Sequence, residues 1–289
     1  RSSLALLAAG LATVAWRGAA CARRLPWVAW WRWGEETFRR LSDGGQALCV
    51  GPTLGVYLLS PNHGLALLGL WLLLVLSYWR LEWTLLLATF AIPFTPFRRP
   101  LGSLAFSPIE SLTIVCIAAW ALQIVRRLES AGVGLPRSRA DLRRLGGQIA
   151  SCVLAVPLDW RGLDGAWAFF VAAAIGSLLV SRHLAVSLRE LRTTVLEPAL
   201  FYLLITRHPL SRPEPQSKRL ILLADALVFA GAALSAQGLW QYFGGDAIVA
   251  EGVRRVRGIY ASPNNLSLVL GRILPLAIAL AWQGQTRWR

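Results

Sequence analysis

A series of apolar stretches runs along the whole chain, and this pattern constrains the fold more than any other feature. Nine stretches can be interpreted as helices: 3–16, 44–60, 63–79, 83–97, 110–126, 164–181, 194–206, 219–242 and 264–282. A helix needs roughly 20 apolar residues to span a bilayer, within a range of about 17–25, and most of the stretches lie near the lower limit. Charged residues make up only 16% of the chain, whereas a soluble domain has about 25%. The sequence therefore predicts an all-α, polytopic integral membrane protein with about nine transmembrane helices, forming a single domain over residues 1–289.

Three segments depart from the simple pattern of spanning helices. Residues 148–158 are too short to cross a bilayer, and we interpret them as an interfacial or re-entrant segment. The stretch 194–206 is also short, so its flanks must contribute, with Arg207 and Arg189 or Arg192 reaching outward. Residues 26–40 combine tryptophans with charged residues, which predicts an amphipathic segment at the head-group level.

The distribution of Lys and Arg among the loops predicts the orientation in the membrane. With 17–43 in the cytoplasm and the spans alternating from there, cytoplasmic segments hold 19 of the 30 Lys and Arg residues and outer segments hold nine. This ratio agrees with the positive-inside rule. Counting 148–158 as a full span would reverse every segment after it. The outer face then carries two arginine groups, 182–192 and 254–257, which oppose the trend and need a reason other than topology.

The net charge of +15 does not predict a nucleic-acid partner. The charges fall in separate short loops rather than on one face, so the anionic head groups of a lipid bilayer explain them better. Cys21, Cys49, Cys116 and Cys152 have no metal-ligand or redox spacing, and we expect them to be inert packing residues. We expect neither a metal nor a cofactor.

The most informative segment for function is 254–275, RRVRGIYASPNNLSLVLGRILP. If its backbone is extended, Arg255 and Arg257 point to one side and Arg254 to the other. Gly258 allows a sharp turn or a close approach to a ligand. The helix that follows is predicted to begin with Ser262 as its N-cap and with proline at its first position. Cationic side chains gathered where a helix enters a bilayer suit a lipid-linked anion such as a diphosphate.

Arg272 lies about halfway along the last apolar stretch. It is adjacent to a stripe of the helix formed by Asn264, Ser267, Gly271 and Pro275. Pro275 cannot donate to the carbonyl of Gly271, so we expect a kink and a free acceptor beside Arg272. A charge near the bilayer centre costs roughly 2.5–3.5 kcal/mol, so Arg272 needs a partner or a water-filled cavity.

Each of these arginines also has an alternative interpretation. Arg272 can be one half of a structural ion pair, for example with Asp225 or Glu197. Arg255 and Arg257 can be solvated loop charges without a ligand.

The segment RRVRGIYASPNNLSLVLGRILPLAIAL at 254–280 follows a pattern close to R-V-x-G-x-(F/Y)-x-x-P-N-x-L-x-x-x-L before an apolar span. In this it resembles the O-antigen ligase and O-antigen polymerase superfamily. Two weaker resemblances lie upstream. LATFAIPFTPFRRPLGSLAFSPIESL at 87–112 is similar to the family's span ending in P-F, followed by a short outer loop and a Glu. SLRELRTTVLEPALFYLLI at 187–205 is similar to its L-R-x-x-R segment before an E-P-containing span. The resemblance covers about residues 65–282.

The resemblance implies a membrane glycosyltransferase at the outer face of the bacterial cytoplasmic membrane. Such enzymes pass a glycan from an undecaprenyl-diphosphate carrier to an acceptor hydroxyl without a metal. By position, Arg255 is the family's arginine in R-V-x-G and the expected catalytic residue, and Gly258, Pro263 and Asn264 match the remaining positions. Arg257 falls where the family's residue varies. Arginine forks can neutralise charge that develops on the leaving diphosphate. The predicted carrier-binding residues are Arg189, Arg192, Arg255, Arg257, Gly258, Asn264 and Arg272.

The chain departs from the family where a general base is required. A base should deprotonate the acceptor hydroxyl, and the family's large outer loop with its histidine lies further along than residue 289. We expect His63, His183 and His208 to be ordinary loop residues that do not replace it. Because the chain also lacks Met and begins inside an apolar run, we expect an N-terminal fragment without that loop and the later helices. Such a fragment should bind the carrier without catalysing transfer.

Two classes of function follow from these observations. The first is a ligase or polymerase that transfers a lipid-linked glycan. The second is a non-catalytic flippase or permease that uses the same arginines to bind a lipid-linked or anionic solute.

Overall fold

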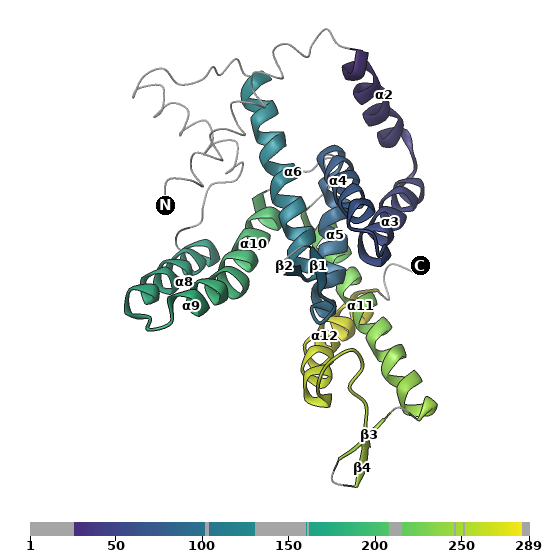
Figure 1. The fold of residues 1–289 in the computed structure, drawn as a ribbon, viewed down its shortest axis with the longest axis vertical. Coiled ribbons are helices and arrows are strands. Elements are labelled where there is room, and N and C mark those ends of the chain that lie inside the picture. The colour runs from purple at the N-terminus through teal and green to yellow at the C-terminus, as the bar shows by residue number, and fades with distance from the viewer. Residues whose placement is uncertain are drawn as a thin grey trace. The chain divides into compact units, whose positions relative to one another are not determined.

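The computed structural model of the chain describes residues 26–101, 104–130, 160, 162–207, 216–245, 247–250 and 252–284 (Figure 1). Most of these residues are helical, as the apolar stretches predict. The chain divides into two compact units, residues 1–49 and residues 50–289. The predicted stretches 3–16 and 148–158 lie outside the described residues.

The first unit contains α2 (Pro26–Arg40) and the beginning of α3 (Asp43–Leu59). The side-chain amide of Gln46 donates to the backbone carbonyls of Phe38 and Leu41, both at 3.1 Å, and so fixes the turn between the two helices. Trp30 and Trp33 are exposed on α2. The segment predicted to be amphipathic at 26–40 is therefore a helix, and Trp30 and Trp33 lie on its surface.

The second unit is built around three helices that follow one another closely. These are α4 (His63–Trp79), α5 (Leu81–Ala91) and α6 (Pro108–Ser130). The side chain of Asn62 caps α4 by accepting from the amide of Gly64 at 2.7 Å. Arg80 is the only residue between α4 and α5, and its extended backbone (φ −152°, ψ 96°) separates the two helices. Pro93 lies in the short 3₁₀ turn η1 (Ile92–Phe94), which ends the helical run of α5.

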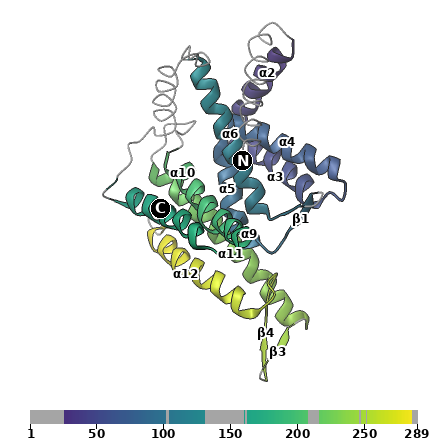
Figure 2. The same ribbon diagram turned by 60° about the vertical axis from the view of Figure 1, so that its left-hand side comes forward.

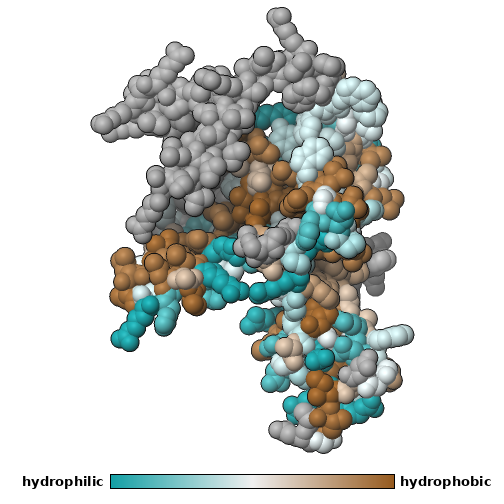
Figure 3. Space-filling view, viewed as in Figure 1, coloured by the Kyte–Doolittle hydropathy of each residue, from teal (hydrophilic) through white to brown (hydrophobic). Residues whose placement is uncertain are grey.

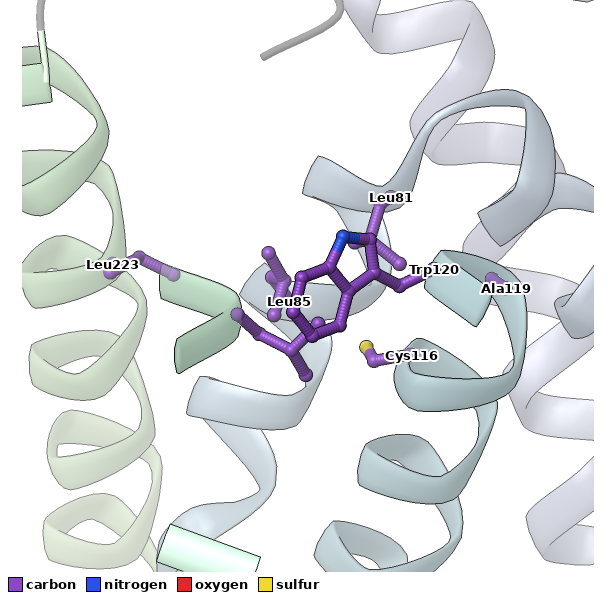
Figure 4. Packing of buried hydrophobic residues seen from close by; sticks show 7 residues of the cluster. Leu81, Leu85, Cys116, Ala119, Trp120 and Leu223 are labelled. Atoms are coloured by element: carbon purple, nitrogen blue, oxygen red, sulfur yellow. The ribbon is translucent and has the colours of Figure 1, made fainter. Parts of the chain in front are cut away.

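The remaining helices complete this unit. They are α8 (Leu163–Ser177), η2 (Leu178–Val180), α9 (Leu184–Glu190), the π-helix η3 (Leu191–Leu196), α10 (Glu197–Arg207), α11 (Gln216–Gly244) and α12 (Pro263–Gly284). A buried apolar cluster joins α5, α6, α10 and α11 (Figure 4). Its members are Leu81, Leu85, Cys116, Ala119, Trp120, Leu204 and Leu223. Cys116 is therefore a packing residue as expected, whereas Cys49 is exposed.

The number of spanning helices is the first point on which the structure differs from the sequence prediction. Within the described ranges, four helices are long and apolar enough to cross a membrane: 108–128, 163–180, 218–244 and 263–282. The stretches 63–79 and 81–94 form shorter apolar helices, because the helix break at Arg80 and the 3₁₀ turn that contains Pro93 limit them. Nine spans are therefore not confirmed.

The short stretch 194–206 is extended at its N-terminal side, as its length requires. α9, η3 and α10 follow without a break from Leu184 to Arg207. The predicted contribution of the flank that carries Arg189 and Arg192 is therefore present as helix.

Two short hairpins correct the prediction of a strictly all-α chain. β1 (Arg99–Leu101) pairs antiparallel with β2 (Leu104–Phe106), and β3 (Ile248–Ala250) pairs antiparallel with β4 (Val253–Arg255). Each hairpin lies in a segment that was predicted to be an outer loop. Backbone groups that have no helical partner in such a segment bond to each other across the hairpin.

The surface of the long helices is strongly apolar. Only 6% of the apolar window in 163–180 and 11% of that in 263–282 is buried inside the protein. Phe169, Leu179 and Val180 are among the most exposed large side chains, and Figure 3 shows apolar residues gathered over the region of α8. Soluble monomers rarely expose apolar patches of this extent, so the surface is compatible with a membrane protein.

The predicted topology puts residues 244–262 outside the membrane and residues 126–147 in the cytoplasm, and cysteine labelling can test this. Single cysteines in a cysteine-free background, placed within 244–262 and within 126–147, should differ in labelling by an impermeant thiol reagent. In intact cells the first segment should react and the second should be protected, because the 19-to-9 distribution of Lys and Arg puts 126–147 in the cytoplasm. The reverse pattern would contradict both the topology and an outer location of the site.

Candidate functional site

The loop that precedes α12 is a hairpin followed by a left-handed turn. α11 and α12 lie side by side, and the β3–β4 hairpin is part of the segment that joins them (Figure 2). In the hairpin Ile248 pairs with Arg255, and Gly252 adopts a φ of +75° between the strands. The predicted extended backbone therefore continues only as far as Arg255. Arg257 lies beyond the strand, next to the turn at Gly258.

Neighbouring arginines of β4 have different surroundings. The guanidinium of Arg254 lies 5.4 Å from the ring centre of Tyr242 on α11, and it donates to the carbonyl of Tyr242 at 3.5 Å. Alternation along the strand puts Arg255 on the opposite face. The side chains of Arg255 and Arg257 are both exposed. The predicted separation of Arg254 from Arg255 is thus present.

Gly258 is the point at which the loop is fixed to α11. Its N–H donates to Oε1 of Gln241, and its carbonyl accepts from Nε2 of the same side chain, both at 2.9 Å. Its φ is +59°, and a Cβ would lie 3.3 Å from a methyl group of Leu266. The sharp turn predicted for Gly258 is present. Since Gln241 occupies both of its backbone groups, Gly258 supports the loop and does not offer these groups to a ligand.

Tyr260 fixes the same loop at a second point. Its hydroxyl donates to the backbone carbonyl of Pro93, 167 residues earlier in the chain. The ring is buried with Leu234 and Leu266, and Phe94 packs against this cluster. Burial raises the pKa of the Tyr260 hydroxyl above its ordinary value.

The beginning of α12 follows the predicted capping pattern. The amide of Asn265 donates to Oγ of Ser262 at 3.4 Å, and Pro263 is the first helical residue. Asn264 is exposed in the first turn. This cap, four residues after Gly258, defines where the loop ends and α12 begins.

Arg272 is exposed on α12, and its neighbour Ile273 rather than Arg272 faces α11. Ile273 packs so closely on α11 that a Cβ at Gly231 would lie 2.9 Å from it, whereas Gly271, Arg272 and Pro275 are exposed. At a rise of 1.5 Å per residue, Arg272 lies roughly 13 Å along the helix from its first residue. It is therefore a separate, deeper cation rather than part of the arginine cluster.

The alternative partners of Arg272 do not engage it. No ion pair or hydrogen bond connects Arg272 to any other residue that the structure describes, so neither Asp225 nor Glu197 neutralises it there. The carboxylate of Glu197 instead lies 3.5 Å from Nε of Arg192. The interpretation of Arg272 as half of a structural pair gains no support from these contacts.

The second arginine group is joined to the first turn of α6. Arg192 is held between two carboxylates, with Oε1 of Glu110 at 3.3 Å and Oε1 of Glu197 at 3.5 Å. Glu110 also accepts from the amide of Ser107 at 2.7 Å, and so links Arg192 to the N-terminus of α6. Arg189 is exposed one helical turn earlier. Both Arg189 and Arg192 were predicted to bind the carrier, but the guanidinium of Arg192 already contacts the carboxylates of Glu110 and Glu197.

These arginines are held in place by Gln241, which the sequence interpretation did not select, and by Tyr260 and Glu110, which belong to the resembling segments but were assigned no role. Gln241, Tyr260 and Glu110 each connect a predicted site segment to a distant helix. The three segments with a family resemblance thereby meet at 87–112: 187–205 reaches it through Glu110, and 254–280 through Pro93. α6 and η1, which carry these two contact points, pack against each other.

Two of the three histidines, His63 and His183, lie among the described residues. His63 begins α4 and His183 precedes α9, and both are exposed, whereas His208 lies outside the described residues. In the part of the chain that the structure describes, no group of three or more His, Cys, Asp or Glu residues could hold a metal ion.

Comparison with known proteins finds no matching family model, no matching curated protein and no matching solved structure. Membership of the O-antigen ligase and polymerase superfamily therefore stays a prediction from the motif at 254–280.

Proposed function

We propose that this protein is a membrane glycosyltransferase of the O-antigen ligase and polymerase type, acting at the outer face of the bacterial cytoplasmic membrane. Its substrate is an undecaprenyl-diphosphate-linked glycan. The reaction breaks the bond between the glycan and the diphosphate and forms a bond from the glycan to an acceptor oxygen. The carrier diphosphate leaves, and the acceptor's proton passes to a base.

The observation that carries this proposal is the fixed presentation of Arg255 and Arg257 beside the first turn of an apolar helix. Both side chains are exposed, so a ligand can reach them. Gln241 and Tyr260 hold the loop through hydrogen bonds to α11 and η1. Donors that are already positioned where negative charge develops stabilise a transition state without further reorganisation. A guanidinium suits this task because its fork matches phosphate oxygens in pairs.

The contacts among the three resembling segments support the same proposal. The motif loop bonds to Pro93, and Arg192 bonds to Glu110, so all three segments converge on 87–112. The predicted topology also assigns each of these contact points to the outer face.

Arg272 is the observation that favours the second candidate, a flippase or permease. It is a cation on an apolar helix, and it has no ion-pair partner among the residues that the structure describes. Charges at such depth are costly and commonly mark a pathway for ions or substrates. In that case Arg255 and Arg272 would bind an anionic head group one after the other along a translocation pathway, and neither would belong to a catalytic site.

Proteoliposomes distinguish the two functions. The full-length protein is supplied with an undecaprenyl-diphosphate-linked glycan labelled in the sugar, together with an acceptor on the same side. Transfer of label to the acceptor with release of carrier diphosphate supports the transferase. Movement of the intact lipid-linked glycan across the bilayer, without release, supports the flippase and contradicts the transferase.

A further inference from the structure

A cavity of about 720 Å³ lies at one end of the α3–α6 bundle, apart from the arginine loop. The end of α3, the beginning of α4, α5 with η1, the first residues of β1 and the first turn of α6 all contribute to it. The size falls within the range of roughly 300–1,000 Å³ that is typical of sites for small ligands. No sequence motif pointed to this cavity.

The cavity combines apolar walls with cations at its rim. Leu58, Leu87, Phe90 and Leu112 are among its apolar lining residues. The charged or titratable residues that line it are Arg98, Arg99 and His63, and no carboxylate is among the lining residues. An excess of positive charge beside an apolar chamber suits a ligand with a hydrocarbon chain and an anionic head.

The two arginines at the rim differ in how they are held. Arg99 donates to the backbone carbonyl of Ser60 and lies 5.6 Å from the ring centre of Tyr57, so its guanidinium is fixed. Its Nε is buried and has no hydrogen-bond partner within the described chain. Arg98 is exposed and makes no ion pair with another described residue. Glu110 does not compensate them, because it is bound to Arg192 and Ser107.

We propose that this cavity is a binding site for an anionic membrane lipid. Its phosphate lies at Arg98 and Arg99, and one hydrocarbon chain enters between α3, α5 and α6. Guanidinium groups bind phosphate oxygens through charge-assisted hydrogen bonds, and the apolar walls remove the chain from water. In the predicted topology residues 60–63 and 98–100 lie at the outer end of their helices, which puts the head group at the outer interface. This proposal does not depend on the transferase activity.

The cavity shares a wall with the support of the arginine loop. Phe94 lines the cavity and also packs against the cluster that contains Tyr260, whose hydroxyl bonds to the neighbouring Pro93. A bound lipid would therefore stabilise η1, on which the arginine loop rests. The lipid would thus help to hold the arginine loop in position without contacting it.

Native mass spectrometry of the full chain, purified in a non-ionic detergent, tests the proposal. Phosphatidylglycerol, phosphatidylcholine and undecaprenyl phosphate are titrated separately, and inorganic phosphate is added as a competitor. We expect phosphatidylglycerol to bind at least about tenfold more tightly than phosphatidylcholine. Both lipids carry a phosphate, but the trimethylammonium of phosphatidylcholine adds a positive charge beside Arg98 and Arg99 and cancels the net negative charge of the head group. Inorganic phosphate should compete weakly, because it has no chain. Tighter binding of undecaprenyl phosphate than of phosphatidylglycerol would also support the proposal, and it would identify a polyprenyl phosphate as the lipid that occupies the cavity.

Three variants separate charge from shape. Arg98→Gln should remove the preference for the anionic lipid, whereas Arg182→Gln, which removes an exposed arginine from another outer segment, should not. Leu87→Trp keeps both arginines but fills the cavity and should weaken every lipid. Arg98→Gln alone decides the matter if Leu87→Trp does not fold, since the exposed Arg98 side chain has no described partner to lose. Equal binding of the two phospholipids by the unmodified protein, or an unchanged preference in Arg98→Gln, would overturn the proposal.

Discussion

Replacement of Arg255 by Ala in the full-length protein is expected to abolish glycan transfer while leaving expression and membrane insertion intact. Arg255 is exposed at the end of β4 and matches the motif's arginine, so its loss removes a donor for the leaving diphosphate. Removal of one such positioned donor typically costs about 10²–10³ in rate. Arg255→Lys should also lose most activity, by about tenfold or more, because a point charge lacks the paired donors of the guanidinium. The measurement is the rate of label transfer in proteoliposomes at saturating acceptor.

Arg254→Ala is the matched control for this experiment. It removes the same charge from the adjacent residue, but Arg254 lies on the other face of the strand, over Tyr242. A cation–π contact at an exposed site contributes about 0.5–1 kcal/mol, so we expect a loss of only about two- to fivefold. Equal losses in the two variants would show that the cluster acts only through its net charge. Full activity in Arg255→Ala would show that these arginines are solvated loop charges.

Gly258→Ala is expected to have the second largest effect, because it acts on the support of the loop. A residue with a Cβ pays about 1–2 kcal/mol for the left-handed conformation that Gly258 adopts at φ +59°. The added methyl group also lies 3.3 Å from Leu266. Displacement of the loop from Gln241 would move the neighbouring Arg257 and Arg255, and a shift of about 1 Å can cost about 10²-fold in rate. Transfer should therefore fall by about 10- to 100-fold, together with a lower thermal midpoint.

Gly271→Ala provides the comparison within the same segment. Gly271 is helical, and a Cβ there would meet nothing within 4 Å. Alanine is favoured over glycine inside a helix by roughly 0.5–1 kcal/mol, so this variant should be as stable as the unmodified protein or more so. If Gly258→Ala behaved like Gly271→Ala in both activity and stability, the two hydrogen bonds between Gln241 and Gly258 would have no role in the site.

The parts of the fold that could be predicted from sequence are those set by local chemistry. The last helix was expected at 264–282 and runs from Pro263 to Gly284, because Ser262 and Pro263 define its beginning unambiguously. The helix at 26–40 has the expected bounds, and the apolar stretch 219–242 lies within α11. Capping residues and apolar periodicity are local signals that extend over a few residues, so they can be recognised in a single sequence without knowledge of distant contacts.

Other parts depended on contacts that a single sequence does not reveal. The stretch 83–97 was interpreted as a span although it has only 15 residues. The helix α5 ends still earlier, at Ala91, because Pro93 and the hairpin that follows redirect the chain. Glu197 was considered as a partner for Arg272, yet it faces Arg192. The π-helix between them has hydrogen bonds from i to i+5, which brings residues five apart onto one face. An ordinary helical wheel does not show this pairing.

The cations of the candidate site come from the sequence motif and stay predictions, whereas the residues that support the loop became visible only in the structure. Arg255, Arg257 and the turn at Gly258 follow from the motif, whereas Gln241 lies 17 residues away on another helix and has no local signal. Arg98 and Arg99 did carry a signal, because they also oppose the positive-inside trend in the predicted topology. They were counted with the outer charges without being assigned a role, and the cavity beside them became visible only when the chain was folded.

The most direct test of the central claim is the affinity of the purified chain for an undecaprenyl-diphosphate analogue, measured as a function of salt concentration. The claim is that Arg255 and its neighbours bind the carrier's diphosphate whether or not transfer follows. We expect the unmodified chain to bind the analogue, the affinity to fall as salt screens the charges, and Arg255→Ala to weaken binding by about tenfold or more while Arg254→Ala does not. An affinity that is independent of salt and unchanged in Arg255→Ala would contradict the claim that this loop recognises a lipid-linked diphosphate.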